Sequence, residues 1–145
     1  MLFPQQFGTV LTVHPWLESQ TGLSQRPLGH APLLGTNKMV SKYLTEAGFD
    51  VLENAGIDVP FEQAGNLSHH EVYRHTKAAA QRHPEADGIL LFGSGWRSLD
   101  AIELLEQDLE IPVAHPVPAR VWTVQKRLRV VEPVSGYGRL LEEMP

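Results

Sequence analysis

The stretch from Asp87 to Ile102 combines an apolar run, a glycine–serine–glycine loop and the start of a helix. Gly93 and Gly95 permit a tight turn and a close approach of the backbone to a ligand. Ser94 adds a hydroxyl group, and the helix that follows offers unpaired N–H groups in its first turn. We therefore expect this stretch to hold an anion such as a carboxylate. An ordinary strand-to-helix turn would explain the same glycines, and both interpretations stay open.

Two further side chains could act near that loop. Arg97, in the first helical turn, could clamp a carboxylate through two hydrogen bonds, or it could simply be exposed. His115 follows an expected strand and lies between Pro112 and Pro116. A histidine at this place could serve as general acid or base near neutral pH, or it could be half-buried and bonded to the backbone.

Three histidines share one short stretch but do not form a metal motif. His69, His70 and His75 include no pair spaced four residues apart, which two metal ligands on one helix face would need. We expect a solvated helix face there and no metal. Ser98 and Asp100 are assigned to helix capping and to interaction with the helix dipole.

Regular elements that could position these residues begin near residue 36. The spacing of apolar residues predicts a helix up to Ala47, ended by Gly48. Strands are predicted at 49–52, 88–92 and 111–114, with a loop at 54–66. Further helices are predicted from a capping box of Ser68 and Glu71 to residue 82, over 98–108, and from Pro118 to residue 128. The helix over 98–108 is expected to bury Leu99, Ile102, Leu105 and Leu109.

The alternation of strands and helices predicts the fold class. We expect an α/β fold, a single three-layer lobe with a parallel sheet, over residues 36–145. In such sheets, ligands bind beyond the carboxyl ends of the strands. Residues 1–35 show no sustained period, and only Thr9–Val13 could form a short strand. We expect an irregular N-terminal segment there.

Composition narrows the class of partner. The formal net charge of −5 comes without a basic patch, which argues against a nucleic-acid partner, and the run Lys126–Arg129 is read as a solvated helix face. The chain has no cysteine, which excludes disulfides, thiolate metal sites and cysteine catalysis within it. No apolar run approaches the roughly 18 residues of a membrane span, and the N-terminus lacks a signal pattern. We expect a cytoplasmic protein with no membrane partner.

From about Thr36 onward, the chain resembles the C-terminal half of the aspartate/glutamate racemase superfamily, above all its maleate cis–trans isomerase and arylmalonate decarboxylase branch. The resemblance rests on NKMVSKYLTEAGFDVL, SHHEVYRHTKAAAQRHPEADGILL, SLDAIELLEQDLEIPV, Pro118-Ala119 with Trp122, and GYGRLLEE at Gly136–Glu143. It implies an enzyme that transfers protons without cofactor or metal. It also implies that backbone amides and short hydroxyls hold a substrate carboxylate in a cleft between two similar lobes.

The chain departs from the pattern that this resemblance implies. Racemases and isomerases of the family use one cysteine in each lobe, and decarboxylases keep only that of the second lobe. Gly93 stands at the second-lobe position and can neither attack a substrate nor transfer a proton, although Ser94 could still offer its N–H. The first lobe has no counterpart, and Pro32–Gly35 replaces the strand and threonine-proline-tyrosine turn expected before the helix at Asn37. A truncated or frame-shifted gene is one explanation, and a natural single-lobe protein is the alternative.

Three functions therefore stay open. The first is an isomerase, racemase or decarboxylase acting on a small carboxylic acid, with His115 or Ser94 taking over proton transfer and with impaired activity. The second is a non-catalytic remnant or carboxylate-binding module. A phosphate- or nucleotide-binding domain is the third, and it lacks a sequence fingerprint. The expected partner is a small carboxylate, with no cofactor. A homodimer could rebuild a two-lobed cleft, although it would still lack cysteine.

Overall fold

The computed structural model describes residues 9–14, 36–57, 59, 61–92 and 95–143. The strands are β1 (Thr9–His14), β2 (Asp50–Gly56), β3 (Gly88–Leu91) and β4 (Val113–Ala114). The helices are α1 (Thr36–Glu46), α2 (His69–Arg82), α3 (Leu99–Leu109), α4 (Pro116–Leu128) and α5 (Arg139–Glu142), with a 3-10 helix η2 (Phe61–Asn66).

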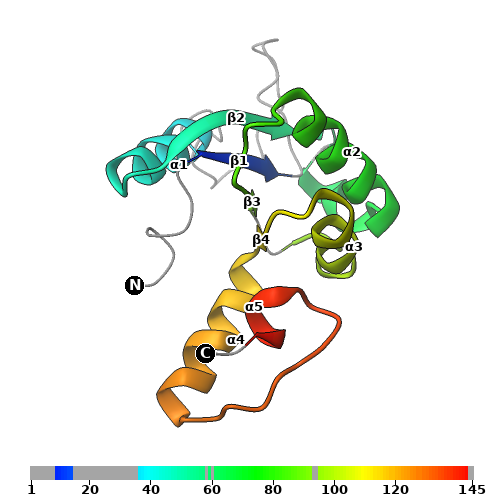
Figure 1. Cartoon of the computed structure of the whole chain (residues 1–145). Coiled ribbons are helices and arrows are strands. Elements are labelled where there is room, and N and C mark those ends of the chain that lie inside the picture. The colour runs from blue at the N-terminus through cyan, green and yellow to red at the C-terminus, as the bar shows by residue number, and fades with distance from the viewer. Residues whose placement is uncertain (1–8, 15–35, 58, 60, 93–94, 144–145) are drawn as a thin grey trace.

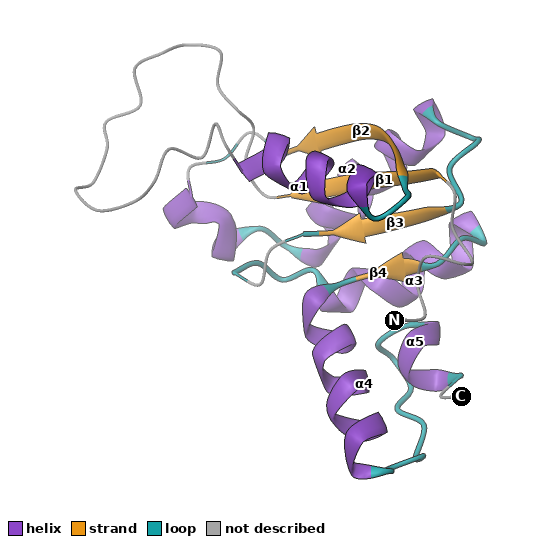
Figure 2. Ribbon diagram, turned by 90° about the vertical axis from the view of Figure 1, so that its left-hand side faces the viewer, coloured by secondary structure: helices purple, strands orange, loops and turns teal. Residues whose placement is uncertain are grey.

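The four strands of the described chain form one parallel sheet in the order β2-β1-β3-β4. Helix α1 lies on one face of this sheet, and α2 and α3 lie on the other (Figures 1 and 2). The predicted three-layer α/β lobe with a parallel sheet is therefore confirmed. Within the described ranges, no helix combines the length and the apolar character needed to cross a membrane.

Strand β1 corrects the sequence analysis. It is an inner strand that pairs with β2 on one side and with β3 on the other, so the lobe extends N-terminal to the boundary expected at residue 36. A strand therefore does precede the Asn37 helix in the sequence, although none was expected there. Residues 15–35 separate β1 from α1 in the sequence. Because a strand was looked for directly before the helix, β1 was not assigned to the lobe. The segment after β1, including Pro32–Gly35, lies outside the described residues.

Strand β2 also runs further than predicted. It continues through Asn54 and Ala55 to Gly56, where a loop was expected. Its last residues pair with β1, with Gly56 opposite His14. This non-local pairing satisfies the backbone of a stretch whose own residue types do not favour a strand.

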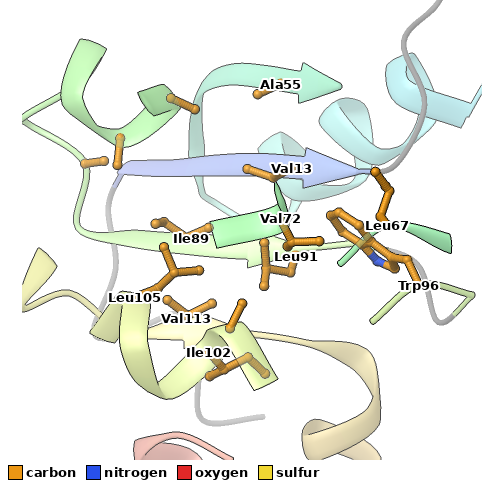
Figure 3. Close-up of a cluster of buried hydrophobic side chains, with 14 residues drawn as sticks. Val13, Ala55, Leu67, Val72, Ile89, Leu91, Trp96, Ile102, Leu105 and Val113 are labelled. Carbon is orange, nitrogen blue, oxygen red and sulfur yellow. The ribbon is translucent and has the colours of Figure 1, made fainter. Parts of the chain in front are cut away.

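The core lies between the sheet and the helices α2 and α3. Val72 on α2 and Ile102 and Leu105 on α3 are fully buried against Ile89 and Leu91 of β3 (Figure 3). Leu99 and Leu109 pack at its margin, which confirms the apolar stripe predicted for α3. Helix α2 begins with the predicted capping box, in which Ser68 and Glu71 exchange hydrogen bonds.

On the opposite face of the sheet, polar contacts join β1, β2 and α1. The Thr12 hydroxyl of β1, fully buried, donates to the Asn54 side chain of β2, whose Nδ2 donates to Ser41 Oγ of α1 at 2.5 Å. Helix α1 ends at Glu46, and Gly48, the predicted stop, takes a positive φ of 95° that favours glycine.

Helix α4 differs from the other long helices in its placement. It begins at the end of β4 and runs away from the sheet, with α5 beside it (Figures 1 and 2). The predicted helix starting at Pro118 is present and begins two residues earlier, at Pro116.

Candidate functional site

The carboxyl ends of the strands meet at one edge of the sheet. Val13 of β1 pairs with Leu91 of β3, and Leu90 pairs with Ala114 of β4, so the segments that follow these strands emerge together. The loop at 92–98 follows β3, and His115 follows β4. Gly93 and Ser94 lie outside the described residues.

Buried and exposed side chains alternate in the second half of the loop, over residues 96–98. Trp96 is buried in the core cluster, Arg97 is exposed, and Ser98 is fully buried. Trp96 lies at the same end of the cluster as Leu67, which precedes α2 (Figure 3). Sequence analysis missed this anchoring role of Trp96. The signal for it was a large aromatic residue directly after a glycine loop.

Gly95 does not have the conformational role that was expected of it. Its φ lies outside the left-handed region, and a Cβ built there would meet no atom of the described residues within 4 Å. Open space, rather than a strained turn, therefore characterises this position. The close approach is made by Gly65 of η2, whose Cβ would lie 3.4 Å from the Gly95 carbonyl oxygen. Gly65 thus brings η2 against the loop.

The capping role predicted for Ser98 is wrong. Ser98 precedes α3 but adopts a helical backbone, and its side chain makes no capping hydrogen bond. Its fully buried Oγ has no hydrogen-bond partner among the described residues. Buried polar atoms are nearly always paired, so an unpaired hydroxyl beside the start of α3 is unusual. The Ala101 N–H in the first turn of α3 donates to the Ser98 carbonyl oxygen at 3.1 Å, whereas the Ser98 hydroxyl caps none of these N–H groups.

His115 is positioned as a cap for α4. Its imidazole is 2% exposed, and Nδ1 accepts a hydrogen bond from the Val117 N–H at 3.1 Å. The neutral ring accordingly carries its proton on Nε2. Of the two interpretations open for His115, this geometry favours the side chain bonded to the backbone. A base acting through Nδ1 would have to break the cap.

The three histidines near α2 are not equivalent. His70 is exposed, whereas His75 is half-buried, and desolvation together with the charge of Arg82 lowers the pKa of His75. The solvated helix face expected for all three is therefore wrong for His75. Within the described part of the chain, no group of three or more His, Asp or Glu side chains is placed to hold a metal ion.

A buried carboxylate holds the strand that leads to His115. Glu106 of α3 accepts the Val113 N–H through Oε1 at 2.9 Å and the Arg139 N–H through Oε2 at 2.7 Å. Burial raises the pKa of Glu106, and these two hydrogen bonds oppose the shift. Sequence analysis missed this role, because a glutamate within an amphipathic helix usually faces water.

The same carboxylate accounts for the second glycine of the GYGRLL motif, Gly138. Gly138 has a φ of 89°, and a Cβ there would lie 2.6 Å from Ile102 Cγ2 and 2.9 Å from Glu106 Oε2. Only glycine allows the C-terminal segment to approach α3 so closely. The motif therefore supports the packing of β4 and α5 rather than contributing a reactive group.

Comparison with known proteins agrees with this geometry. A curated arylmalonate decarboxylase from Bordetella bronchiseptica is 41% identical over 61 residues, which is 41% of this chain and 25% of that protein. The crystal structure of an arylmalonate decarboxylase superposes with a TM-score of 0.76 at 22% identity, covering 94% of this chain and 54% of the other. A Nocardia farcinica maleate cis–trans isomerase mutant with a covalently bound succinylcysteine intermediate gives 0.74 at 20% identity, covering 97% and 50%.

These likenesses cover unequal shares of the proteins compared. The chain spans about half the length of the two solved structures that it resembles. The model of the arylmalonate decarboxylase family matches residues 30–141, which is most of the chain. The chain belongs to the arylmalonate decarboxylase family.

Proposed function

We propose that this chain binds a small carboxylate at the carboxyl edge of its sheet and that its proton-transfer chemistry is impaired. The absence of cysteine from the whole sequence carries this proposal. The Nocardia farcinica isomerase holds its intermediate on a cysteine. Gly93 stands where the family resemblance expects that residue, and glycine offers no group for the step. Neither a cofactor nor a metal is needed for the binding that we propose.

The first turn of α3 is the proposed anchor for the carboxylate. The positive end of the helix dipole favours an anion there, and the Ser94 and Gly95 amides precede this turn in the sequence. Open space at Gly95 leaves room for a ligand there. The exposed Arg97 guanidinium could pair with the second carboxylate of a dicarboxylic acid.

An active enzyme is the alternative within the same family. It would assign proton transfer to His115 or to Ser94. The buried His115 ring already accepts the Val117 N–H, so its Nδ1 is not available as a base without loss of the α4 cap. A general acid or base contributes about 10²–10⁴ in rate, which is the deficit expected for the missing cysteine.

Binding is tested by adding maleate or an arylmalonate to the ¹⁵N-labelled full chain. We expect the largest amide shifts at residues 95–99 and a loss of affinity of about tenfold in Arg97→Ala, which removes one charge-assisted pair. Arg74→Ala is the matched control, because it removes the same kind of exposed side chain from α2. Equal effects of the two substitutions, or shifts elsewhere in the chain, would contradict the proposed site.

A further inference from the structure

An apolar stripe runs along the outer face of α4. It consists of Val117, Val121, Val124 and Leu128, whose spacings of four, three and four residues place them on one side of a helix. Val121, Val124 and Leu128 are 41%, 53% and 69% exposed, respectively. Single exposed apolar side chains are ordinary, whereas a continuous row of them marks an interaction surface.

Two arginines, Arg120 and Arg127, border this stripe on one side. Helix α4 contains Arg120, Lys126 and Arg127 and no acidic residue. Arg120 and Arg127 both lie next to Val124 on the helix surface, at separations of four and three residues. Because the chain as a whole has a net charge of −5, the residues outside α4 are more acidic than the total. The charge of α4 therefore complements the remainder of the same protein.

Helix α3 has an exposed face whose charge is opposite to that of α4. It contains Asp100, Glu103, Glu106 and Asp108 and no basic residue. Glu106 is buried and Asp108 pairs with Lys77 of α2, so the face that points to solvent carries Asp100, Leu104 and Gln107. Leu104 is 43% exposed, and Asp100 lies one turn before it. An apolar side chain beside an acidic one fits an apolar stripe bordered by arginines.

We propose that the α4 stripe of one copy docks on the exposed face of α3 in a second copy, and that the contact is reciprocal. Each copy supplies one α4 and one α3, so a twofold axis closes the assembly. One chain carries both the apolar stripe with its arginines and the acidic face, so a second copy of the same chain can cover them both. Because α4 begins at the His115 cap, the contact also secures the helix beside the carboxyl edge of the sheet.

The mass of the full chain in solution tests the assembly. Light scattering at micromolar concentration is expected to give twice the 16.2 kDa of the chain. Val124→Asp should raise the dimer dissociation constant by at least about tenfold, because it buries a charge in an apolar contact. Met39→Asp is the matched control, since Met39 is 66% exposed but lies on α1. A monomer in the unsubstituted protein, or equal effects of the two variants, would overturn the proposal.

A charge exchange tests the pairing of α4 with α3. Arg120→Glu and Asp100→Lys should each weaken the dimer, and the double variant should recover much of the loss, because the two changes restore opposite charges across both contacts. Added salt should weaken the native dimer. A dimer that tightens with salt and shows no recovery in the double variant would indicate α4 packed on α4, and would overturn the assignment to α3.

Discussion

Helices α3 and α4 have the same kind of sequence pattern but different surroundings. In both, apolar residues recur at helical spacing. Ile102 and Leu105 of α3 are fully buried against the sheet, whereas Val124 and Leu128 of α4 are largely exposed (Figures 1 and 3). Periodicity thus predicts that a helix has an apolar face, but it does not tell what covers that face. The lobe completes its core with α2 and α3 and leaves α4 available for a partner.

Leucine-to-alanine substitutions on the two helices give the largest expected difference between the buried face of α3 and the exposed face of α4. Leu105→Ala should lower the free energy of unfolding by about 2–5 kcal/mol, because it opens a cavity in the core. Leu128→Ala should change it by less than about 0.5 kcal/mol, since that side chain is largely in water. Urea unfolding at a concentration where the chain is monomeric compares the two. Similar losses for both would mean that α4 is covered within its own chain.

The second comparison concerns Glu106, a buried carboxylate on α3, whereas α4 contains no acidic residue. Glu106→Gln should cost about 1–3 kcal/mol although the shapes match, because the amide has one acceptor oxygen and leaves a buried N–H of Val113 or Arg139 unpaired. Glu103→Gln, on a less buried side of the same helix, should change stability by less than about 0.5 kcal/mol. Urea unfolding of both variants is the measurement. A neutral Glu106→Gln would show that Glu106 does not hold the C-terminal segment.

Alanine substitutions of two serines that precede helices should change the stability of the protein in opposite directions. Ser68→Ala should destabilise the protein by about 1 kcal/mol, because it removes the capping box of α2. Ser98→Ala should stabilise it by about 1 kcal/mol, since it removes a buried hydroxyl that has no partner among the described residues. Thermal unfolding of both variants checks this. A loss in Ser98→Ala would mean that the hydroxyl is paired in solution.

The smallest expected effect is the pH dependence of the free energy of unfolding that comes from His75 on α2, the helix that packs beside α3. The pKa of His75 lies below its ordinary 6.5 in the folded protein. At His75 the unfolded chain therefore binds more protons below that pH, so the contribution of this residue to stability should fall as the pH drops from 7.5 to 5.5. His75→Gln should make this fall shallower, whereas the exposed His70→Gln should leave it unchanged. Urea unfolding at both pH values compares the three proteins. An unchanged slope in His75→Gln would contradict the assignment.

Local patterns predicted what depends on local structure. The capping box at Ser68 and the stripe on α3 follow from residues close in sequence, and both are present. The local pattern marked Thr9–Val13 as a possible strand, and β1 is present there, but its pairing with β2 across residues 15–35 cannot be read from a local pattern. At the site, the unpaired Ser98 and the buried Glu106 escaped prediction for the same reason. Their surroundings come from segments far away in the sequence.

The central claim is that the site keeps its carboxylate anchor without the proton-transfer step. Maleate or an arylmalonate, incubated with the unsubstituted chain in deuterated water, is followed by proton NMR. We predict ligand resonances that broaden on binding, with no isomerised, decarboxylated or deuterated product. Product formation above the rate without protein, lost in His115→Ala or Ser94→Ala, would contradict the claim.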